Sequence, residues 1–555
     1  MAFALEKKLS KDEILGLYLN EVYLGQAGGS SVCGVDAAAR SYFGKPIERL
    51  TLGEAATLGG IISSPNPYSP LRHPDKAQER RDLALTRMVT MGWATAEEAA
   101  RAKKSTLQVN PPRGGRVAPW AVDAVIERVE DTVGEGSIAR DSMVVYTSIQ
   151  PALQRLAERA VADGMTELVA AHPKLADVEA ALAVVRVQDG AIVALVGGRD
   201  PDRSAFDRAS LARRQVGSTV KALTALAAFE EDPALSPAYV LDDSPLTRTH
   251  DGKEWSPKNY DGSFQGPIPL RRALAQSRNI PAVLLAEKVG MTTLRDRLQA
   301  LGLKGATDYP SAALGGFEAT PLELAGAYAV LGGKGYHAPW LLRAAVKGDA
   351  FAIDAPPEKA TVRYSPRATW LAWSVLREVL ETGTGKSASK YGVGPGAIGK
   401  SGTTDNAVDA WFAGLAGPYA VVAWVGHDKN KPVGLTGGQA ALPLWARFVA
   451  STGADRTPVA PPDSVIEATV CVATGLPPCD DCAESGTEWF PVGAVPEPDC
   501  DGDGVRDAGT RGASAPGEVE APRVRGKDGH GGNALPPGQA KKEGWQKLGD
   551  WLFGR

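Results

Sequence analysis

The stretch GSTVKALTALAAFEE at residues 217–231 decides the fold expected for this chain. Before it, the apolar runs ALAVVRV (181–187) and GAIVALVG (190–197) predict a buried strand and its hairpin partner. The Ala-rich residues 219–231 predict a helix. Ser218 therefore stands at a helix N-terminus, where free N–H groups and the helix dipole stabilise developing negative charge.

Ser218 opens the first of three short polar strings. Lys221 follows three residues later on the same helix face, and a lysine buried beside a positive helix end is expected to titrate low enough to act as an amine base. The second string contains Ser277 and Asn279, which are suited to relaying a proton and to holding a substrate amide. A serine with a lysine base is a known variant of the hydroxyl nucleophile.

The third string is Lys400, Ser401, Gly402 and Thr403, on a predicted edge strand over 397–404. Its small residues leave room for an extended substrate backbone alongside the strand. The lysine and the two hydroxyls suit a substrate carboxylate. The backbone N–H groups of Thr403 and of the nucleophile are expected to form an oxyanion hole.

The three strings follow the order S-x-x-K, S-x-N and K-S-G. Further matches at 387–390 and 64–66 fail on order or context. With the flanks RQVG at 214–217, IPAV at 280–283 and DAWFAG at 409–414, the chain resembles the class A penicillin-binding proteins, which are bifunctional peptidoglycan synthases. The serine at position 401, where the family more often has threonine, keeps the hydroxyl.

The resemblance implies an α+β fold. A penicillin-binding or serine β-lactamase-like transpeptidase domain, with an antiparallel sheet and a helical subdomain, is expected over 178–450. The α-helical C-terminal part of a lysozyme-like glycosyltransferase domain is expected over 1–105, joined by a linker region at 106–177. A cysteine-containing extension then covers 451–507, and the Gly-, Pro- and charge-rich residues 508–555 predict a disordered tail.

The activity implied by the resemblance is that of a D,D-transpeptidase. Ser218 would be acylated by a D-Ala-D-Ala stem peptide, and an acceptor amine on a second stem would resolve the acyl-enzyme. β-Lactams would acylate the same serine, and no cofactor is implied. Two alternatives stay open: a D,D-carboxypeptidase or β-lactamase in which water is the acceptor, and a truncated, non-catalytic scaffold that binds penicillin.

The resemblance also bears on the first hundred residues, where apolar positions such as Leu15 and Tyr18 form a helical stripe. The family's two catalytic glutamates belong to motifs expected upstream of Met1. Glu13 and Glu21 do not sit in those motifs, so we expect no glycosyltransferase activity and an N-terminally truncated sequence. In the full-length family, lipid II is the glycosyltransferase substrate.

No signal peptide or membrane-spanning run is found in the sequence. The full-length family member is expected in the inner membrane with its catalytic part in the periplasm. The 555 residues are 43% hydrophobic and 23% charged, with a net charge of −4, which gives no argument for a nucleic-acid partner. Six histidines are scattered without ligand spacing, which disfavours a zinc hydrolase.

Cysteines cluster after the predicted catalytic region. Cys33 stands alone and is expected to be a small buried residue, whereas Cys471, Cys479, Cys482 and Cys500 predict two disulfides in a secreted setting. Three pairings are possible and the sequence does not choose among them. A zinc half-site or redox pair formed by the cysteines at 479 and 482 is the alternative.

An acidic string at 499–507 contains the last of these cysteines. Asp499, Asp501, Asp503 and Asp507 fit the front of a calcium loop, with oxygens at alternate positions and a turning glycine. Thr510 stands where such a loop usually has a bidentate glutamate. A solvated acidic turn is therefore the favoured interpretation, and calcium is the weaker one.

Overall fold

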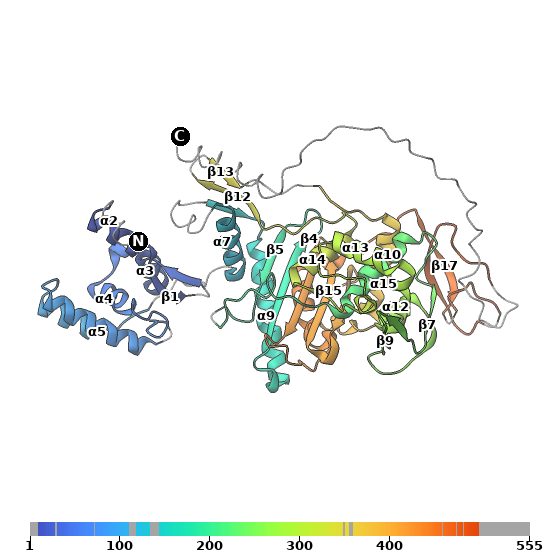
Figure 1. Cartoon of the computed structure of the whole chain (residues 1–555), viewed down its shortest axis with the longest axis horizontal. Helices are drawn as coiled ribbons and strands as arrows, with labels where there is room; N and C mark the ends of the chain where they lie inside the picture. Colours follow the sequence, from blue (N-terminus) through green and yellow to red (C-terminus); the bar gives the residue numbers. More distant parts are fainter. Residues whose placement is uncertain are drawn as a thin grey trace. The chain divides into compact units, whose positions relative to one another are not determined.

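The computed structural model describes residues 9–27, 30–71, 73–109, 118–133, 144–201, 203–347, 350–353, 359–457, 459–472, 474–480 and 482–498. The described chain contains an N-terminal helical part and a larger part that is built on a five-stranded sheet (Figure 1).

Helices dominate the N-terminal part. They are α2 (Lys11–Glu21), α3 (Val35–Phe43), α4 (Leu52–Ile61), α5 (Pro74–Thr90) and α6 (Ala96–Lys104). Capping boxes start three of them, at Ser10, Thr51 and Thr95. Glu13 completes the first box by accepting the Ser10 N–H at 2.7 Å, so its carboxylate serves the helix end.

Two expectations for this part are wrong, namely an uninterrupted run of helices and a buried Cys33. A hairpin of β1 (Tyr23–Ala27) and β2 (Ser30–Cys33) interrupts the expected run of helices. The apolar stripe of α2 packs into no core, because the helix has no buried residue and Leu15 is 53% exposed. Cys33 is exposed rather than buried. Apolar periodicity identified the helix correctly but not its surroundings.

The larger part is built on an antiparallel sheet in the order β14-β15-β16-β4-β5. Its strands are β4 (Glu179–Arg186), β5 (Ile192–Val196), β14 (Ala397–Thr403), β15 (Asp409–Ala416) and β16 (Tyr419–Gly426). The predicted hairpin is present as β4 and β5, and the predicted edge strand is β14. In the register of the sheet, Lys400 pairs with Ala413.

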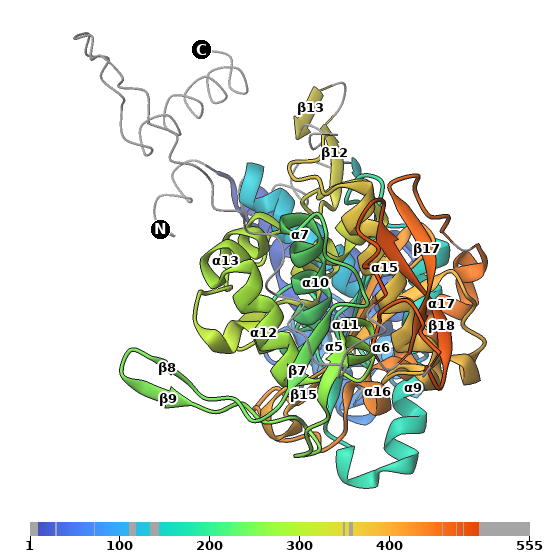
Figure 2. The same cartoon turned by 90° about the vertical axis from the view of Figure 1, so that its right-hand side faces the viewer.

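Helices cover both faces of this sheet (Figures 1 and 2). Alternate residues of β4 divide between two cores: Ala183 packs with α10 (Val220–Glu231), α14 (Pro321–Ala329) and α15 (Pro366–Glu381). Leu182 packs with α9 (Pro151–Ala171) and α17 (Leu442–Thr452). Burial on both faces explains the continuous apolar runs, and the α+β fold is confirmed.

Shorter elements adjoin the face of the sheet that α10, α14 and α15 cover. They are β6 (Arg214–Gln215), η3 (Gly217–Thr219), β7 (Val240–Asp243), β8 (Arg248–His250), β9 (Lys253–Trp255), β10 (Gly266–Pro269), α11 (Leu270–Ala275), α12 (Asn279–Val289), α13 (Met291–Ala300), β11 (Glu318–Ala319) and α16 (Gly437–Ala440). β7 pairs with β10, and β8 pairs with β9. The chain between α10 and α11 therefore forms two antiparallel strand pairs, the second of which lies between the strands of the first in sequence.

The region expected to be a linker contributes packed elements. α7 (Pro119–Val133) and β3 (Val144–Thr147) precede α9, and β3 joins β12 (Leu342–Lys347) and β13 (Ala350–Ile353) in a separate sheet. On α9, the Gln154 amide exchanges hydrogen bonds of 2.8 and 2.9 Å with the backbone of Leu195. This helix therefore belongs structurally with the large sheet.

A hairpin of β17 (Val465–Cys471) and β18 (Ser485–Pro491) follows α17. Cys471 and Cys482 form a disulfide, and Cys479 is also disulfide-bonded. The zinc half-site and redox-pair interpretation is therefore wrong. Outside the described residues lie Cys500, the calcium candidates Asp499, Asp501, Asp503 and Asp507, and the tail at 508–555.

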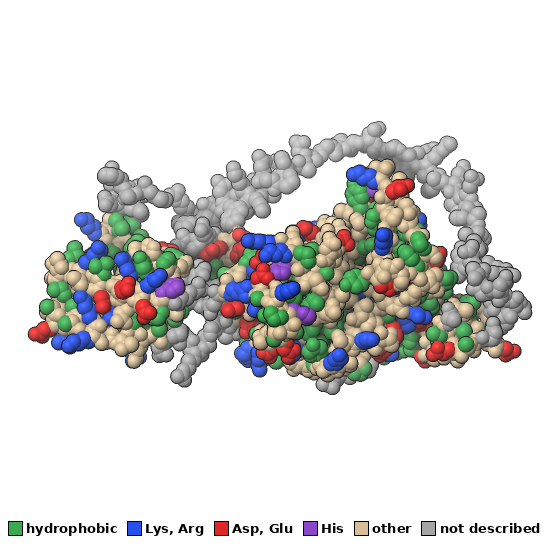
Figure 3. All heavy atoms as spheres, turned by 90° about the horizontal axis from the view of Figure 1, so that it is seen from below, with side chains coloured by type: hydrophobic (Ala, Val, Ile, Leu, Met, Phe, Trp, Pro, Cys, Tyr) green, Lys and Arg blue, Asp and Glu red, His purple; other side chains and the backbone are tan. Residues whose placement is uncertain are grey.

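The helices in the described ranges include none with the length and apolar character needed to cross a bilayer. On the face drawn in Figure 3, Lys and Arg side chains are interspersed with Asp and Glu. This mixture agrees with the small net charge of the chain.

Candidate active site

Ser218 lies in the turn η3, directly ahead of α10. Gly217 before it has a φ of +53°, and a Cβ there would come within 2.9 Å of the Thr403 carbonyl oxygen. The turn therefore passes directly beside the edge strand β14, and glycine is needed both for its backbone and for this approach. The Ser218 side chain is half-buried and lines a cleft.

Lys221 is fully buried one turn further along. Its amine donates to the Ser277 carbonyl at 2.8 Å, the Arg278 carbonyl at 3.2 Å and the Asn279 side-chain oxygen at 2.6 Å. Burial, followed by the positive charges of Lys400 and Arg278, holds the pKa of Lys221 well below its ordinary value. The first two strings therefore meet around one amine that is disposed to lose its proton.

Ser277 also contacts a second lysine, Lys400 of the third string. The Lys400 amine donates to the Ser277 hydroxyl at 2.8 Å, and the Lys221 amine lies 3.5 Å from the same oxygen. Ser277 has a φ of +59°, which is uncommon for a residue with a side chain. Burial lowers the pKa of Lys400 to about 7. A proton can therefore pass between either amine and this hydroxyl.

The structure places Lys400 differently from Ser401 and Thr403. The two hydroxyl residues line the cleft, whereas Lys400 is fully buried and contacts Ser277 behind them. The Ser401 hydroxyl shares a 2.7 Å hydrogen bond with Thr384, and Gly402 packs so tightly that a Cβ there would lie 2.7 Å from the side chain of Thr219. Only the outward residues of this strand are thus available to a substrate carboxylate.

The cleft has a volume of about 730 Å³. Besides the residues of the three strings and Thr384, its walls contain residues that the sequence reasoning did not single out, among them Trp255, Lys258, Tyr260 and Asn406. Most lie in loops, where no periodicity marks a functional side chain. Thr384 falls in the Gly-Thr-Gly string at 383–385, which is the one local signal that was available.

Comparisons with known proteins agree with this geometry. Residues 1–89 match the family model Transglycosylase, and residues 180–448 match Penicillin binding protein transpeptidase domain. Penicillin-binding protein 1B of Vibrio cholerae is 34% identical over 81% of this chain, and that of Escherichia coli is 32% identical over 84%. The chain belongs to the class A penicillin-binding proteins.

The match is partial on the relatives' side. The chain spans 58% and 56% of the lengths of the Vibrio and Escherichia relatives. A crystal structure of penicillin-binding protein 1A from Haemophilus influenzae superposes with a TM-score of 0.65, covering 89% of this chain and 93% of that one. At 24% identity this likeness concerns the fold. Both expected domain types of a class A penicillin-binding protein are therefore represented.

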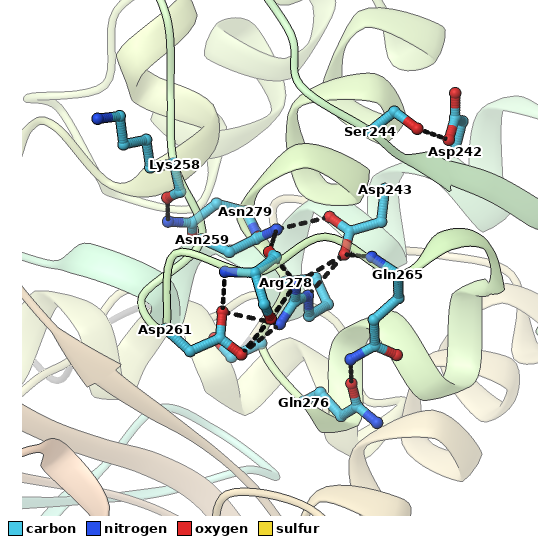
Figure 4. Close-up of polar contacts among 12 residues, drawn as sticks. Asp242, Asp243, Ser244, Lys258, Asn259, Asp261, Gln265, Gln276, Arg278 and Asn279 are labelled. Carbon is cyan, nitrogen blue, oxygen red and sulfur yellow. Dashed lines mark hydrogen bonds and ion pairs between the residues drawn. The ribbon is translucent and has the colours of Figure 1, made fainter.

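In this penicillin-binding protein a buried ionic network supports the second string (Figure 4). Arg278, between the two named residues of the S-x-N string, is ion-paired with the fully buried Asp243 at 2.8 Å and with Asp261 at 3.0 Å. Asn259 donates to Asp243 at 2.7 Å and accepts the backbone N–H of Asn279 at 2.7 Å. These partners come from other segments of the chain, so no local pattern around Arg278 predicts them.

Proposed function

We propose that this chain is a D,D-transpeptidase that cross-links peptidoglycan stem peptides through an acyl-enzyme on Ser218. The observation that carries the proposal is the position of the Ser277 hydroxyl, 2.8 Å from the Lys400 amine and 3.5 Å from the Lys221 amine, in the cleft that Ser218 also lines. Membership of the class A penicillin-binding proteins supports the same chemistry.

In the proposed acylation, the Ser218 oxygen attacks the carbonyl carbon between the two terminal D-alanines. Its proton passes to the neutral amine of Lys221, and the backbone N–H groups of Ser218 and Thr403 stabilise the oxyanion. The peptide C–N bond then breaks, and the proton reaches the departing amine of D-alanine through the Ser277 hydroxyl. The products are free D-alanine and an ester on Ser218.

In the proposed second step, the amine of a neighbouring stem peptide attacks the ester carbonyl. A new peptide bond forms, the ester C–O bond breaks, and Ser218 recovers its proton from the amine by way of Lys221. Asn279, Ser401 and Thr403 hold the donor peptide along β14, their side chains meeting its amide and terminal carboxylate. No cofactor takes part in either step.

The proposed ligands follow from this chemistry. β-Lactams acylate the same serine, and the resulting ester persists because no amine resolves it. For the whole protein, we propose lipid II as the substrate of the transglycosylase-type part, and the inner membrane with the catalytic part in the periplasm as its location.

Intact mass after incubation with a fluorescent penicillin tests the nucleophile. Wild type is expected to gain one adduct that reverses slowly, and Ser218→Ala to gain none. Release of D-alanine from a pentapeptide, with and without an acceptor amine, separates the reaction types. A cross-linked product with acceptor supports the transpeptidase, whereas release to water alone, or rapid loss of the penicillin adduct, supports a carboxypeptidase or β-lactamase.

A further inference from the structure

The second string is held in an uncommon backbone conformation by contacts between its middle residue, Arg278, and groups outside the three strings. Ser277 has a φ of +59°, and the next residue, Arg278, returns to φ −59° and ψ 138°. A left-handed non-glycine residue persists only where its surroundings fix it, and such residues gather at functional sites. Contacts of the neighbouring side chains must therefore hold the backbone at Ser277 in this conformation.

Arg278 is the anchor that makes these contacts. Its Nε donates to Asp243 at 2.8 Å, one terminal nitrogen donates to Asp261 at 3.0 Å, and the other donates to the backbone carbonyl of Ser263. All three guanidinium nitrogens are thus engaged, and the Arg278 side chain is 5% exposed. A planar fork with donors in three directions fixes the backbone from which it projects, which a lysine cannot reproduce.

Asp243 connects this anchor to the cleft. It is fully buried at the end of β7, where it also accepts the Asn259 amide at 2.7 Å and the Gln265 N–H at 3.1 Å. Both partners belong to residues 257–265, which we call the rim loop because Lys258 and Tyr260 within it line the cleft. One carboxylate thus holds the rim loop and the second string together.

The rim loop in turn grips Asn279. The Asn259 side chain accepts the Asn279 N–H at 2.7 Å, and the Asn279 amide donates to the Lys258 carbonyl at 2.6 Å. The remaining side-chain oxygen of Asn279 accepts the Lys221 amine at 2.6 Å. An unbroken chain of contacts therefore runs from Asp243 to the proposed base.

We propose that Asp243 and Arg278 are positioning residues for acylation, holding Ser277 between the two lysines and the rim loop against Asn279. This inference rests on the proposed function. A buried ion pair adds little net stability over a well-packed apolar pair, because both charges lose their hydration. Its value here is the single geometry that it imposes on Ser277 and Asn279.

The pair also sets the charge around the base. Besides Asn279 and the Ser277 hydroxyl, Lys221 faces three charged groups: Lys400 from β14, and Arg278 and Asp243 from the network. The positive charge of Arg278 favours the neutral form of Lys221. Removing that charge raises the pH at which the base becomes neutral, whereas replacing arginine by lysine keeps the charge and removes the fork.

The experiment measures the acylation rate constant of the full chain with a fluorescent penicillin between pH 6 and 10, for wild type, R278K, R278Q and D243N. Asp242→Asn is the matched control, because Asp242 is the exposed neighbour of Asp243 in β7. R278K and D243N are expected to acylate about 10 to 100 times more slowly, as for a displacement of reacting groups by about 1 Å. R278Q is expected to show the same loss of acylation rate. The acid limb of its pH–rate profile is also expected to move to higher pH.

The outcomes separate the inference from the proposed function. A wild type that takes no label overturns the proposed function and this inference with it. The inference alone is overturned if wild type is labelled and R278K, R278Q and D243N all acylate within twofold of its rate. Their pH–rate profiles would then also have the same limbs as that of wild type. If D243N melts below the assay temperature, R278K carries the test, since it retains a buried cation for Asp243.

Discussion

The amine of Lys400 lies 2.8 Å from the hydroxyl oxygen of Ser277, although 123 residues separate the two in sequence. The contact joins the edge strand β14 to the segment directly before α12. It also gives a buried ammonium group a partner other than solvent, because Lys400 is fully buried and does not line the cleft. The K-S-G string therefore contributes an amine to the proposed proton path as well as hydroxyls to the cleft.

Ser277→Ala is expected to slow acylation by a penicillin by about 100-fold, because it removes the only hydroxyl in the described chain that both amines approach. Stopped-flow labelling with a fluorescent penicillin measures the rate. The control is Ser389→Ala, an exposed serine outside the cleft, which is expected to leave the rate unchanged. A Ser277→Ala protein that acylates like wild type would remove the relay from the mechanism.

The free energy of unfolding is expected to rise with pH above 7, through Lys400. Its folded pKa of about 7 lies below the ordinary value of 10.5, so between these values the unfolded chain binds the proton that the folded chain has lost. Stability gained this way is full above the unfolded pKa and is lost as the pH falls toward 7, at up to about 1.4 kcal/mol per pH unit.

Lys400→Met removes this contribution. Urea unfolding at pH 7, 8 and 9, followed by the fluorescence of the buried tryptophans of the sheet region, is expected to show a slope about 1 kcal/mol per pH unit shallower in the variant. Lys221 remains in both proteins, and loss of the Lys400 charge raises its pKa, which changes the slope in the same direction. Equal slopes would mean that Lys400 keeps an ordinary pKa in the folded protein.

The sequence predicted those features that depend on burial or on ordered short strings. The runs at 181–187 and 190–197 are apolar because β4 and β5 are covered on both sides, and the three strings meet because their order matches the path of the chain through one fold. The partners of Arg278 could not be predicted from the sequence, since nothing near Asp243 or Asn259 in the chain marks them until folding brings them together. Side-chain networks between distant segments have no local signature.

The disulfide between Cys471 and Cys482 is expected to stabilise the β17–β18 hairpin. It closes a loop with a sequence separation of 11, for which the chain-entropy estimate is about 3 kcal/mol. A Cys471→Ser, Cys482→Ser double variant is therefore expected to melt earlier than wild type while it still acylates, because these residues do not line the cleft. Cys33→Ser, at an exposed free thiol, is the control. Unchanged melting of the double variant would contradict a stabilising role.

Gly217→Ala is expected to slow acylation by about 100-fold without unfolding the protein. The substitution strains the backbone, because φ is +53°, and it drives a methyl group to within 2.9 Å of the Thr403 carbonyl. The turn must then move away from β14, which separates the Ser218 hydroxyl from the proposed oxyanion hole, and a displacement of about 1 Å slows such a reaction by about 100-fold.

Gly392→Ala separates the two effects of that substitution. Gly392 has a φ of +80°, but a Cβ there would meet no atom within 4 Å, so its alanine variant carries the backbone strain without the clash. We expect it to lose about 1 kcal/mol of stability and to acylate normally. Penicillin labelling and urea unfolding of both variants measure the two quantities. If Gly217→Ala acylated as fast as Gly392→Ala, the close approach of the turn to Thr403 would not be required for the reaction.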